Sequence, residues 1–291
     1  MKQLTVISGK GGTGKTTIAA AFASLAHNAV IADCDVDAAD MHLILDPDVQ
    51  ETIDFYGLDV AVIDPDQCTK CGVCREHCRF DAITSDITIE SHRCEGCGVC
   101  EYVCPVDAIT MKDRRSGWMY RSLTRFGPMV HAKLGIGEEA SGKLVAVVRE
   151  NARKMAEEQE RDLVIIDGPP GTGCSVIAAI TGVDMVLVVT EPSLSGIHDL
   201  ERVVDVAYHF GIPAMVCINK YDINDENTRL IEEYCKDLEI PVVGRLPFDN
   251  APTQAMINEM TVCEYSDSEF SQEVDRIWER VLDELLQAGD Q

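Results

Sequence analysis

Eight cysteines crowd into a short stretch of this sequence and restrict how that stretch can fold. Of the 13 cysteines in the 291-residue chain, eight fall between Cys68 and Cys104. The run that begins at Cys68 recurs 26 residues later at Cys94, and each copy reads Cys-x-x-Cys-x-x-Cys-x-x-x-Cys. Three thiolates at this spacing on a glycine-containing loop can bind three corners of a cubic metal cluster. The fourth ligand must come from elsewhere in the chain.

This repeat resembles the two-cluster [4Fe-4S] ferredoxins of bacteria, in which the fourth cysteine of each run binds the other cluster. The first run ends in Cys78-Arg79, whereas the second ends in Cys104-Pro105 as the ferredoxin pattern expects. Arginine in place of proline is expected to alter the loop beside the second cluster and its potential. Two zinc sites are the alternative, but zinc usually takes two separate Cys-x-x-Cys pairs. The resemblance implies one cluster on Cys68, Cys71, Cys74 and Cys104, and a second on Cys94, Cys97, Cys100 and Cys78.

A second motif lies near the N-terminus. Residues 4–7 are typical of a short buried strand and residues 18–26 of an alanine-rich helix, and Gly-x-x-x-x-Gly-Lys-Thr lies between them. This context predicts a phosphate-binding P-loop, in which Lys15 neutralises the β and γ phosphates and Thr16 binds Mg²⁺. A chance glycine-rich turn is the alternative. The predicted nucleotide-binding residues of the loop are Gly9, Lys10, Gly11, Gly12, Thr13, Gly14, Lys15, Thr16 and Thr17.

A second lysine in this loop, Lys10, narrows the resemblance. It is similar to the signature of the deviant Walker A family, which includes the Mrp, MinD, ParA and nitrogenase iron proteins. In those families this lysine reaches across a dimer interface to the partner's nucleotide. The resemblance therefore implies an ATP-dependent homodimer in which Lys10 and Lys15 are both catalytic. The alternative is that Lys10 is only a solvated loop charge.

Two acidic segments fit the same resemblance. A predicted strand at 29–32 is followed by Asp35, which stands where relatives place a carboxylate that orients the attacking water. The apolar run at 163–166 is typical of a buried parallel strand and leads to Asp167, the expected carboxylate for Mg²⁺. The residues that follow look like the switch II segment that senses the γ-phosphate: Gly168, Pro169, Pro170 and Gly171.

The strand predicted at 214–219 ends in Asn219-Lys220-Tyr221-Asp222. Relatives contact the nucleotide base with the asparagine at this place. The same residues also match the Asn-Lys-x-Asp guanine motif, in which the aspartate accepts hydrogen bonds from guanine. We expect Asn219 and Asp222 to bind the nucleotide, and the resemblance favours ATP over GTP.

Strands alternate with helical stretches, predicted at 141–158, 175–181, 195–210 and 225–238. This order predicts an α/β, doubly wound, mostly parallel sheet. Because the P-loop and Asp167 lie on opposite sides of the cysteines, we expect a discontinuous ATPase domain, 1–63 and 112–291. Between them lies an inserted α+β bacterial-type ferredoxin domain, 64–111.

Charge and hydropathy exclude several classes of protein. The formal net charge of -25 disfavours binding to nucleic acid or to an anionic membrane. Apolar stretches are far shorter than a membrane span, and no targeting segment precedes the P-loop, which predicts a cytoplasmic protein. A terminal amphipathic helix expected at 269–287 has an acidic polar face, so we expect it to pack on the protein rather than on a membrane.

Several features have two interpretations. Residues 112–133 carry six basic side chains and one acidic one, so this strip is either a docking surface for an acidic partner or packs on the acidic body of the chain. His131 is either structural or part of a partner surface. Cys34 and Cys174 flank the switch segments, and each is either a responsive thiolate or a small buried residue.

Together the motifs look like MinD-superfamily ATPases that carry an inserted ferredoxin domain. The first hypothesis is an ATPase whose homodimer supports assembly or maturation of a metallocluster on a partner protein. A second is an ATP-gated, low-potential electron donor similar to the nitrogenase iron protein. A spatial organiser similar to MinD or ParA is a third, which the charge and the terminal helix disfavour.

Overall fold

The computed structural model describes residues 1–135, 138 and 141–287, and the chain divides into two compact units. We call Met1–Thr52, Met119–Ala132 and Ser141–Gln291 the sheet unit, and Ile53–Trp118 with Lys133–Ala140 the cysteine unit. The insert predicted at 64–111 falls inside the cysteine unit. No helix in the described part of the chain is long and apolar enough to cross a bilayer.

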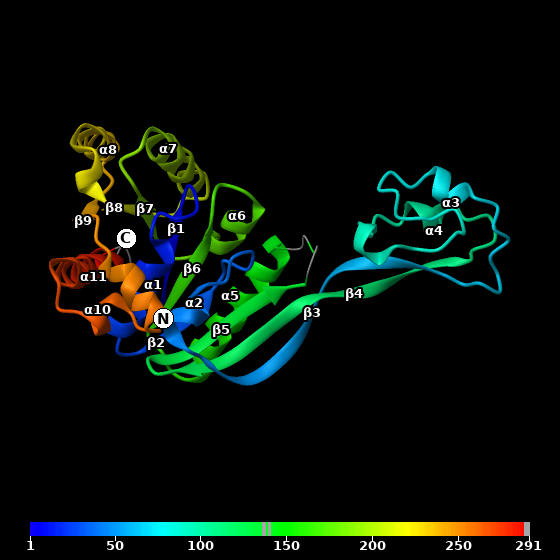
Figure 1. Ribbon diagram of the computed structural model, residues 1–291, viewed down its shortest axis with the longest axis horizontal. Coiled ribbons are helices and arrows are strands. Elements are labelled where there is room, and N and C mark those ends of the chain that lie inside the picture. The colour runs from blue at the N-terminus through cyan, green and yellow to red at the C-terminus, as the bar shows by residue number, and fades with distance from the viewer. Residues whose placement is uncertain (136–137, 139–140, 288–291) are drawn as a thin grey trace. The chain divides into compact units, whose positions relative to one another are not determined.

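A mixed sheet of nine strands, counted over the described residues, forms the framework (Figure 1). Its strand order is β3-β4-β5-β2-β6-β1-β7-β8-β9. The pairs β5-β2, β2-β6, β6-β1, β1-β7, β7-β8 and β8-β9 are parallel, as the alternating pattern predicts. The strands are β1 (Lys2–Ser8), β2 (Ala29–Asp33), β3 (Asp48–Ile63), β4 (Ile109–Thr124), β5 (Gly127–Leu134), β6 (Leu163–Pro170), β7 (Met185–Thr190), β8 (Ala214–Asn219) and β9 (Val242–Leu246).

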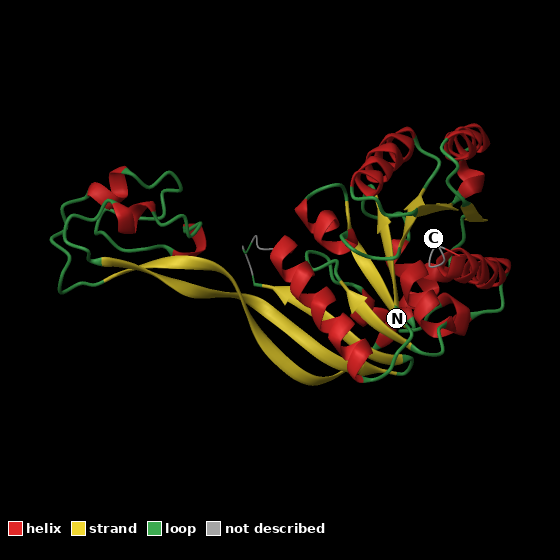
Figure 2. Cartoon of the chain, turned by 180° about the vertical axis from the view of Figure 1, so that it is seen from behind, coloured by secondary structure: helices red, strands yellow, loops and turns green. Residues whose placement is uncertain are grey.

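Helices cover both faces of this sheet (Figure 2). On one face α1 packs on β1 and β6 and contacts α2, α10 and α11, while α9 contacts α2 and α10. On the other, α5 and α6 pack together on β6, and α7 packs on β7 beside α8. The helices are α1 (Lys15–Leu25), α2 (Met41–Leu45), α5 (Ser141–Glu158), α6 (Cys174–Ile180), α7 (Leu194–His209), α8 (Asp225–Asp237), α9 (Ala251–Ile257), α10 (Val262–Tyr265) and α11 (Glu269–Gln287).

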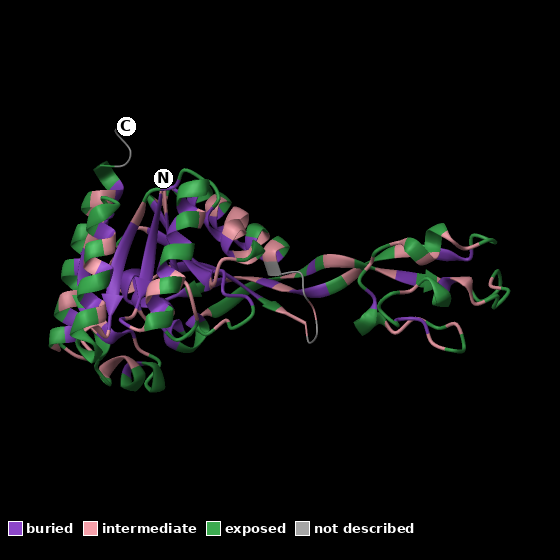
Figure 3. Cartoon of the chain, turned by 90° about the horizontal axis from the view of Figure 1, so that it is seen from above, coloured by how far each residue is buried: buried purple, intermediate pink, exposed green. Residues whose placement is uncertain are grey.

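The core lies along the central parallel strands, whose residues are almost all buried (Figure 3). Their apolar runs are buried on both faces because helices cover both. The rings of Phe22 in α1 and Trp278 in α11 lie 4.8 Å apart, so the terminal helix packs on the body of the chain as expected. Burial of such aromatic side chains is a large part of what holds two layers together.

The basic strip at 112–133 forms most of β4 and β5, joined by a turn at Arg125 and Phe126. In the sheet unit Arg121 lies 3.6 Å from Glu51, and Arg125 lies 2.7 Å from Glu264. In the cysteine unit Arg114 lies 2.8 Å from Glu138. These arginines therefore pair within the chain, which favours intramolecular packing over a docking surface.

The cysteine unit repeats its backbone as it repeats its sequence. Two short helices, α3 (Val73–Glu76) and α4 (Val99–Tyr102), each follow a glycine in the left-handed region, Gly72 with φ 82° and Gly98 with φ 75°. A 3₁₀ turn, η1, spans Ser91–Arg93. The repeats also exchange equivalent backbone hydrogen bonds, from Asp64 N to Ala108 O and from Glu90 N to Ala82 O. The unit thus has approximate internal symmetry, with each half bound to the other.

Candidate functional site

The glycine-rich loop between β1 and α1 forms the centre of the site. Gly14 caps the start of α1 with φ 93°, a conformation that strains other residues. A Cβ at Gly14 would also lie 2.4 Å from the side-chain nitrogen of Asn219. Both constraints require glycine, so the spacing of the sequence motif has a local structural cause.

Lys15, the first residue of α1, lies between two carboxylates. Its ammonium nitrogen is 3.0 Å from Asp35 Oδ2 and 3.0 Å from Asp167 Oδ1. Burial alone would lower the pKa of Lys15, but attraction to Asp167 and then to Asp35 outweighs it and raises the pKa above its ordinary value. Three residues that the sequence predicts for phosphate, water and metal chemistry therefore meet at one point.

In the part of the chain that the structure describes, two buried aspartates near Lys15 each have a side-chain oxygen without a hydrogen-bond partner. Asp33, the last residue of β2, pairs in register with Asp167 within β6, and burial raises the pKa of both carboxyls. Among the described residues, Oδ2 of Asp33 and Oδ2 of Asp167 are buried without a hydrogen-bond partner. Orphaned carboxylate oxygens beside the Thr16 hydroxyl are the hard oxygen ligands that Mg²⁺ prefers. The residues present therefore fit the predicted magnesium site at Thr16 and Asp167.

A cavity of about 260 Å³ opens beside the loop. Gly12, Gly14, Thr17 and Asn219 line one side of it. The Asn219 side chain donates a 2.7 Å hydrogen bond to the carbonyl of Thr13, which ties the end of β8 to the loop. The opposite wall comes from the segment after β9, which the sequence motifs did not indicate: Pro247, Phe248, Asp249, Asn250, Pro252 and Thr253.

Asp222 has a different place. It is not among the described residues that line this cavity, and its carboxylate instead accepts a 2.7 Å hydrogen bond from the backbone nitrogen of Phe248. Asp222 thereby holds the segment that forms the far wall. This arrangement favours a positioning role over direct recognition of guanine.

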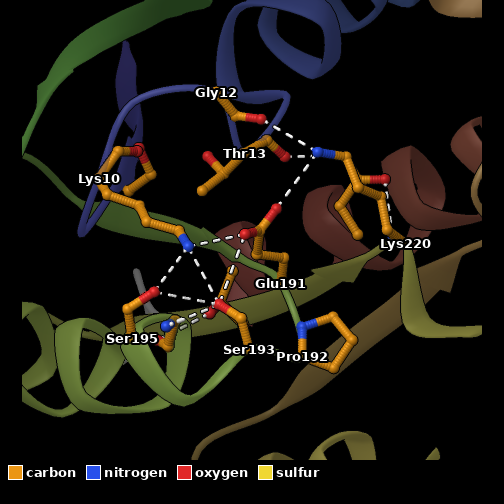
Figure 4. Close-up of polar contacts among 12 residues, drawn as sticks. Lys10, Gly12, Thr13, Glu191, Pro192, Ser193, Ser195 and Lys220 are labelled. Carbon is orange, nitrogen blue, oxygen red and sulfur yellow. Dashed lines mark hydrogen bonds and ion pairs between the residues drawn. The ribbon is translucent and has the colours of Figure 1, made fainter. Parts of the chain in front are cut away.

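Lys10 binds residues of its own chain (Figure 4). Its ammonium nitrogen lies 2.7 Å from Glu191 Oε1, 3.0 Å from Ser193 Oγ and 2.9 Å from Ser195 Oγ. Glu191 Oε2 lies 3.2 Å from the ammonium nitrogen of Lys220, which also donates to the carbonyl of Gly12. No local sequence motif marks Glu191 or the two serines as members of the site.

The predicted switch II segment begins within β6. A Cβ at Gly168 would lie 2.7 Å from a methyl carbon of Ile7. Pro170 ends the strand, and Gly171 donates a 2.8 Å backbone hydrogen bond to Ser8. Cys174, at the start of α6, is exposed. The segment therefore lies along the P-loop strand.

The other single residues have structural surroundings. Cys34 is fully buried, and burial raises the pKa of its thiol, which disfavours a reactive thiolate. His131 bonds to Ser122 at 2.9 Å and stacks on Tyr120. Burial, with a smaller effect from His42, lowers the pKa of His131 to about 4. The surroundings of Cys34 and of His131 therefore favour a structural role in packing for each residue.

Five of the eight repeat cysteines lie in or against one small apolar core of the cysteine unit: Cys74, Cys78, Cys94, Cys100 and Cys104. The other three lie on loops: Cys68, Cys71 and Cys97. Cys78, Cys94, Cys97 and Cys100 line a common cavity. Within the described residues, no three potential ligands converge on a single metal ion. A cubane spreads its ligands over four irons, so such convergence is not what its site requires.

Comparison with known proteins matches residues 4–262 to the CobQ/CobB/MinD/ParA nucleotide binding domain. An uncharacterized protein of Methanocaldococcus jannaschii is 34% identical over 282 residues, covering 96% of this chain and 96% of the relative.

Solved structures of low sequence identity share the fold. The septum site-determining protein MinD of Pyrococcus horikoshii, complexed with Mg-ADP, has a TM-score of 0.59 at 16% identity and covers 96% of this chain and 95% of that one. The MinC:MinD cell division protein complex of Aquifex aeolicus gives a TM-score of 0.59 at 15% identity, with 97% and 96% covered.

Proposed function

The chain belongs to the CobQ/CobB/MinD/ParA nucleotide-binding family and is a P-loop ATPase, and from that premise we propose that ATP drives pairing of two copies whose cysteine units carry iron–sulfur clusters. The observation that carries the proposal is the cavity lined by Cys78, Cys94, Cys97 and Cys100. These are the four cysteines that the interleaved ferredoxin pattern assigns to one cluster.

For hydrolysis, the sheet unit supplies each required group. Lys15 turns from the two carboxylates to the β and γ phosphates, which frees Asp35 to orient the attacking water and Asp167, with Thr16, to bind Mg²⁺. When bound, Mg²⁺ neutralises charge that develops on the phosphates. Asn219 holds the loop against the base cavity, and Lys10 leaves its own chain to reach the partner's nucleotide.

In the cysteine unit, the chemistry of the donors supports two [4Fe-4S] sites. The backbone nitrogen of Lys70 donates to the sulfur of Cys68 at 3.4 Å, and that of Ala108 donates to the sulfur of Cys104 at 3.2 Å. Cys68 and Cys104 both belong to the predicted ligand set that does not line the cavity. Hydrogen bonds of this kind orient ligand atoms toward a metal site. Bound clusters would supply one-electron transfer at low potential.

As the first candidate function we propose ATP-dependent assembly or maturation of a metallocluster on a partner protein. Cys71 and Cys97 are exposed, so each predicted set has a ligand at the surface, where a cluster can be handed on. The same exposure also serves an electron donor, which is the second candidate.

The solved relatives favour a third candidate, a spatial organiser like MinD, since one solved MinD is complexed with Mg-ADP and another with MinC. The exposed acids of α11, among them Glu269, Asp275 and Glu279, oppose attachment of that helix to an anionic membrane.

One anaerobic experiment separates the three. Purified protein, chemically reduced and then freed of the reductant, with Lys15→Ala as the control, is mixed with ATP and either an iron-free ferredoxin or an oxidised, iron-loaded ferredoxin. Iron and sulfide that move to the iron-free ferredoxin only with intact Lys15 support assembly. Reduction of the iron-loaded ferredoxin, with all iron retained by the donor, supports electron donation. ATP-dependent pelleting with liposomes or DNA, and no iron in the protein, supports an organiser.

A further inference from the structure

Glu191 lies where two parallel strands end side by side. In the β7–β8 pair Thr190 is opposite Ile218, so the chain leaves the sheet at Glu191 after β7 and at Lys220 after β8. Strand β1 lies on the other side of β7 and leads to Lys10. The topology alone therefore brings one carboxylate between two lysines.

The backbone fixes Glu191 in this place. Its carbonyl accepts a 2.8 Å hydrogen bond from Ser193, and a Cβ at Gly196 would lie 2.2 Å from the same oxygen. Only glycine permits this close approach. The side chain is thus presented from a tight turn, and only 16% of it is exposed.

The two oxygens of Glu191 divide between the lysines. Oε1 binds Lys10 at 2.7 Å, and Oε2 binds Lys220 at 3.2 Å. Burial alone would raise the pKa of the Glu191 carboxyl, but hydrogen bonds from Lys10 and Lys220 outweigh it and lower the pKa. The carboxylate is therefore charged at neutral pH.

We infer that Glu191 is a positioning residue that holds Lys10 on its own chain and so sets how readily two copies pair, while Lys220 eases the release of Lys10. This inference rests on the proposed dimer, in which Lys10 crosses to the partner. Lys10 must then leave Glu191, Ser193 and Ser195. Because Lys220 remains bound to Glu191, the departure leaves no uncompensated buried carboxylate.

Substitutions of Glu191 and of Lys220 should change the dimer dissociation constant in opposite directions. Glu191→Gln removes the charge that retains Lys10, and a partly buried ion pair of this kind changes an equilibrium by about three-fold. Each dimer releases two copies of Lys10, so the dimer dissociation constant should fall by about ten-fold. Lys220→Met leaves Lys10 as the remaining cation on Glu191, so the dissociation constant should rise by a similar factor.

The test is sedimentation equilibrium of each variant in an Asp35→Asn background, which prevents hydrolysis. ATP is kept at a saturating concentration, so that differences in nucleotide affinity do not affect the result. We expect tighter pairing for Glu191→Gln and weaker pairing for Lys220→Met. The double variant that carries both substitutions should pair as tightly as Glu191→Gln alone. Ser195→Ala removes a milder contact and should tighten pairing slightly. Circular dichroism verifies that each variant is folded.

Two results would overturn the inference. If Glu191→Gln and Ser195→Ala pair no more tightly than their parent, or if Glu191→Gln and Lys220→Met both weaken pairing, Glu191 is only structural and the dimer proposal stands. If the parent stays monomeric with ATP, the dimer proposal itself fails, and the inference fails with it.

Discussion

The ammonium nitrogen of Lys15 lies 3.0 Å from Oδ1 of Asp167, although 152 residues separate the two in the chain. Parallel pairing of β1 with β6 makes this contact possible, because it brings the ends of both strands together. The whole cysteine unit lies in the intervening sequence. The link between the two motifs is therefore a property of the sheet and not of either motif alone.

Lys15→Met should abolish hydrolysis and also destabilise the fold. ATP hydrolysis should fall by at least about 100-fold, because a charge that stabilises the transition state is lost. Unfolding free energy at neutral pH should fall by about 3 kcal/mol, because Asp35 and Asp167 lose their buried partner. Urea denaturation with Lys2→Met, at a partly exposed lysine, as control tests the second effect. Equal stability of the two variants would contradict it.

His131 should make the fold sensitive to acid. Its pKa is lowered to about 4 from an ordinary 6.5, so the unfolded chain binds a proton in this interval that the folded chain does not. Stability should be highest above pH 6.5 and fall by up to about 3 kcal/mol as pH decreases to 4.

His131→Gln should reduce that loss. The difference between variant and wild type isolates this group from Asp33, whose raised pKa makes stability fall as pH rises. Denaturation midpoints from pH 4 to 7 provide the measurement, with the exposed His27→Gln as control for loss of an imidazole. An unchanged slope in His131→Gln would refute the assignment.

Pairs of cysteine variants test the interleaving of the two ligand sets. Wild type should contain about eight irons per chain. Cys78→Ser with Cys100→Ser disrupts one predicted set, so about four irons should remain. Cys78→Ser with Cys74→Ser disrupts both, so little iron should remain. The reverse order would show that Cys78 belongs with Cys74. Cys174→Ser controls for loss of a thiol outside the repeat.

ATP should be preferred over GTP, and Asp222→Ala should not change that preference, since Asp222 binds the Phe248 backbone. Asn219→Ala should weaken binding of both nucleotides by about ten-fold, because the Thr13 carbonyl loses a buried hydrogen bond. Competition of labelled ATP with ATP and GTP measures both effects. A selective loss of GTP binding in Asp222→Ala would restore a direct role for Asp222.

Much of the sheet unit could be predicted from local patterns. The predicted helices at 141–158 and 269–287 match the bounds of α5 and α11, and the predicted strand at 214–219 matches β8. These segments have clear helical periodicity or continuous apolar runs, so local sequence suffices.

Strands β3 and β4 were not predicted, because their charged residues hide the pattern of a strand. Arg121 in β4 lies 3.6 Å from Glu51 in β3, a contact between strands that the local sequence does not reveal. Glu191 was not predicted as part of the site for a similar reason. Its role depends on contacts with Lys10 and Lys220, which lie 181 and 29 residues away in the chain. Contacts of this kind depend on topology, which no local motif encodes.

The most direct test of the account is a sedimentation run on anaerobically purified Asp35→Asn protein, followed by visible light that iron–sulfur clusters absorb. With ATP, the absorbing species should double in mass, and Lys10→Ala should prevent the change. A colourless protein, or a coloured one whose mass does not respond to ATP, would contradict the proposed union of a nucleotide-driven pair with iron–sulfur clusters.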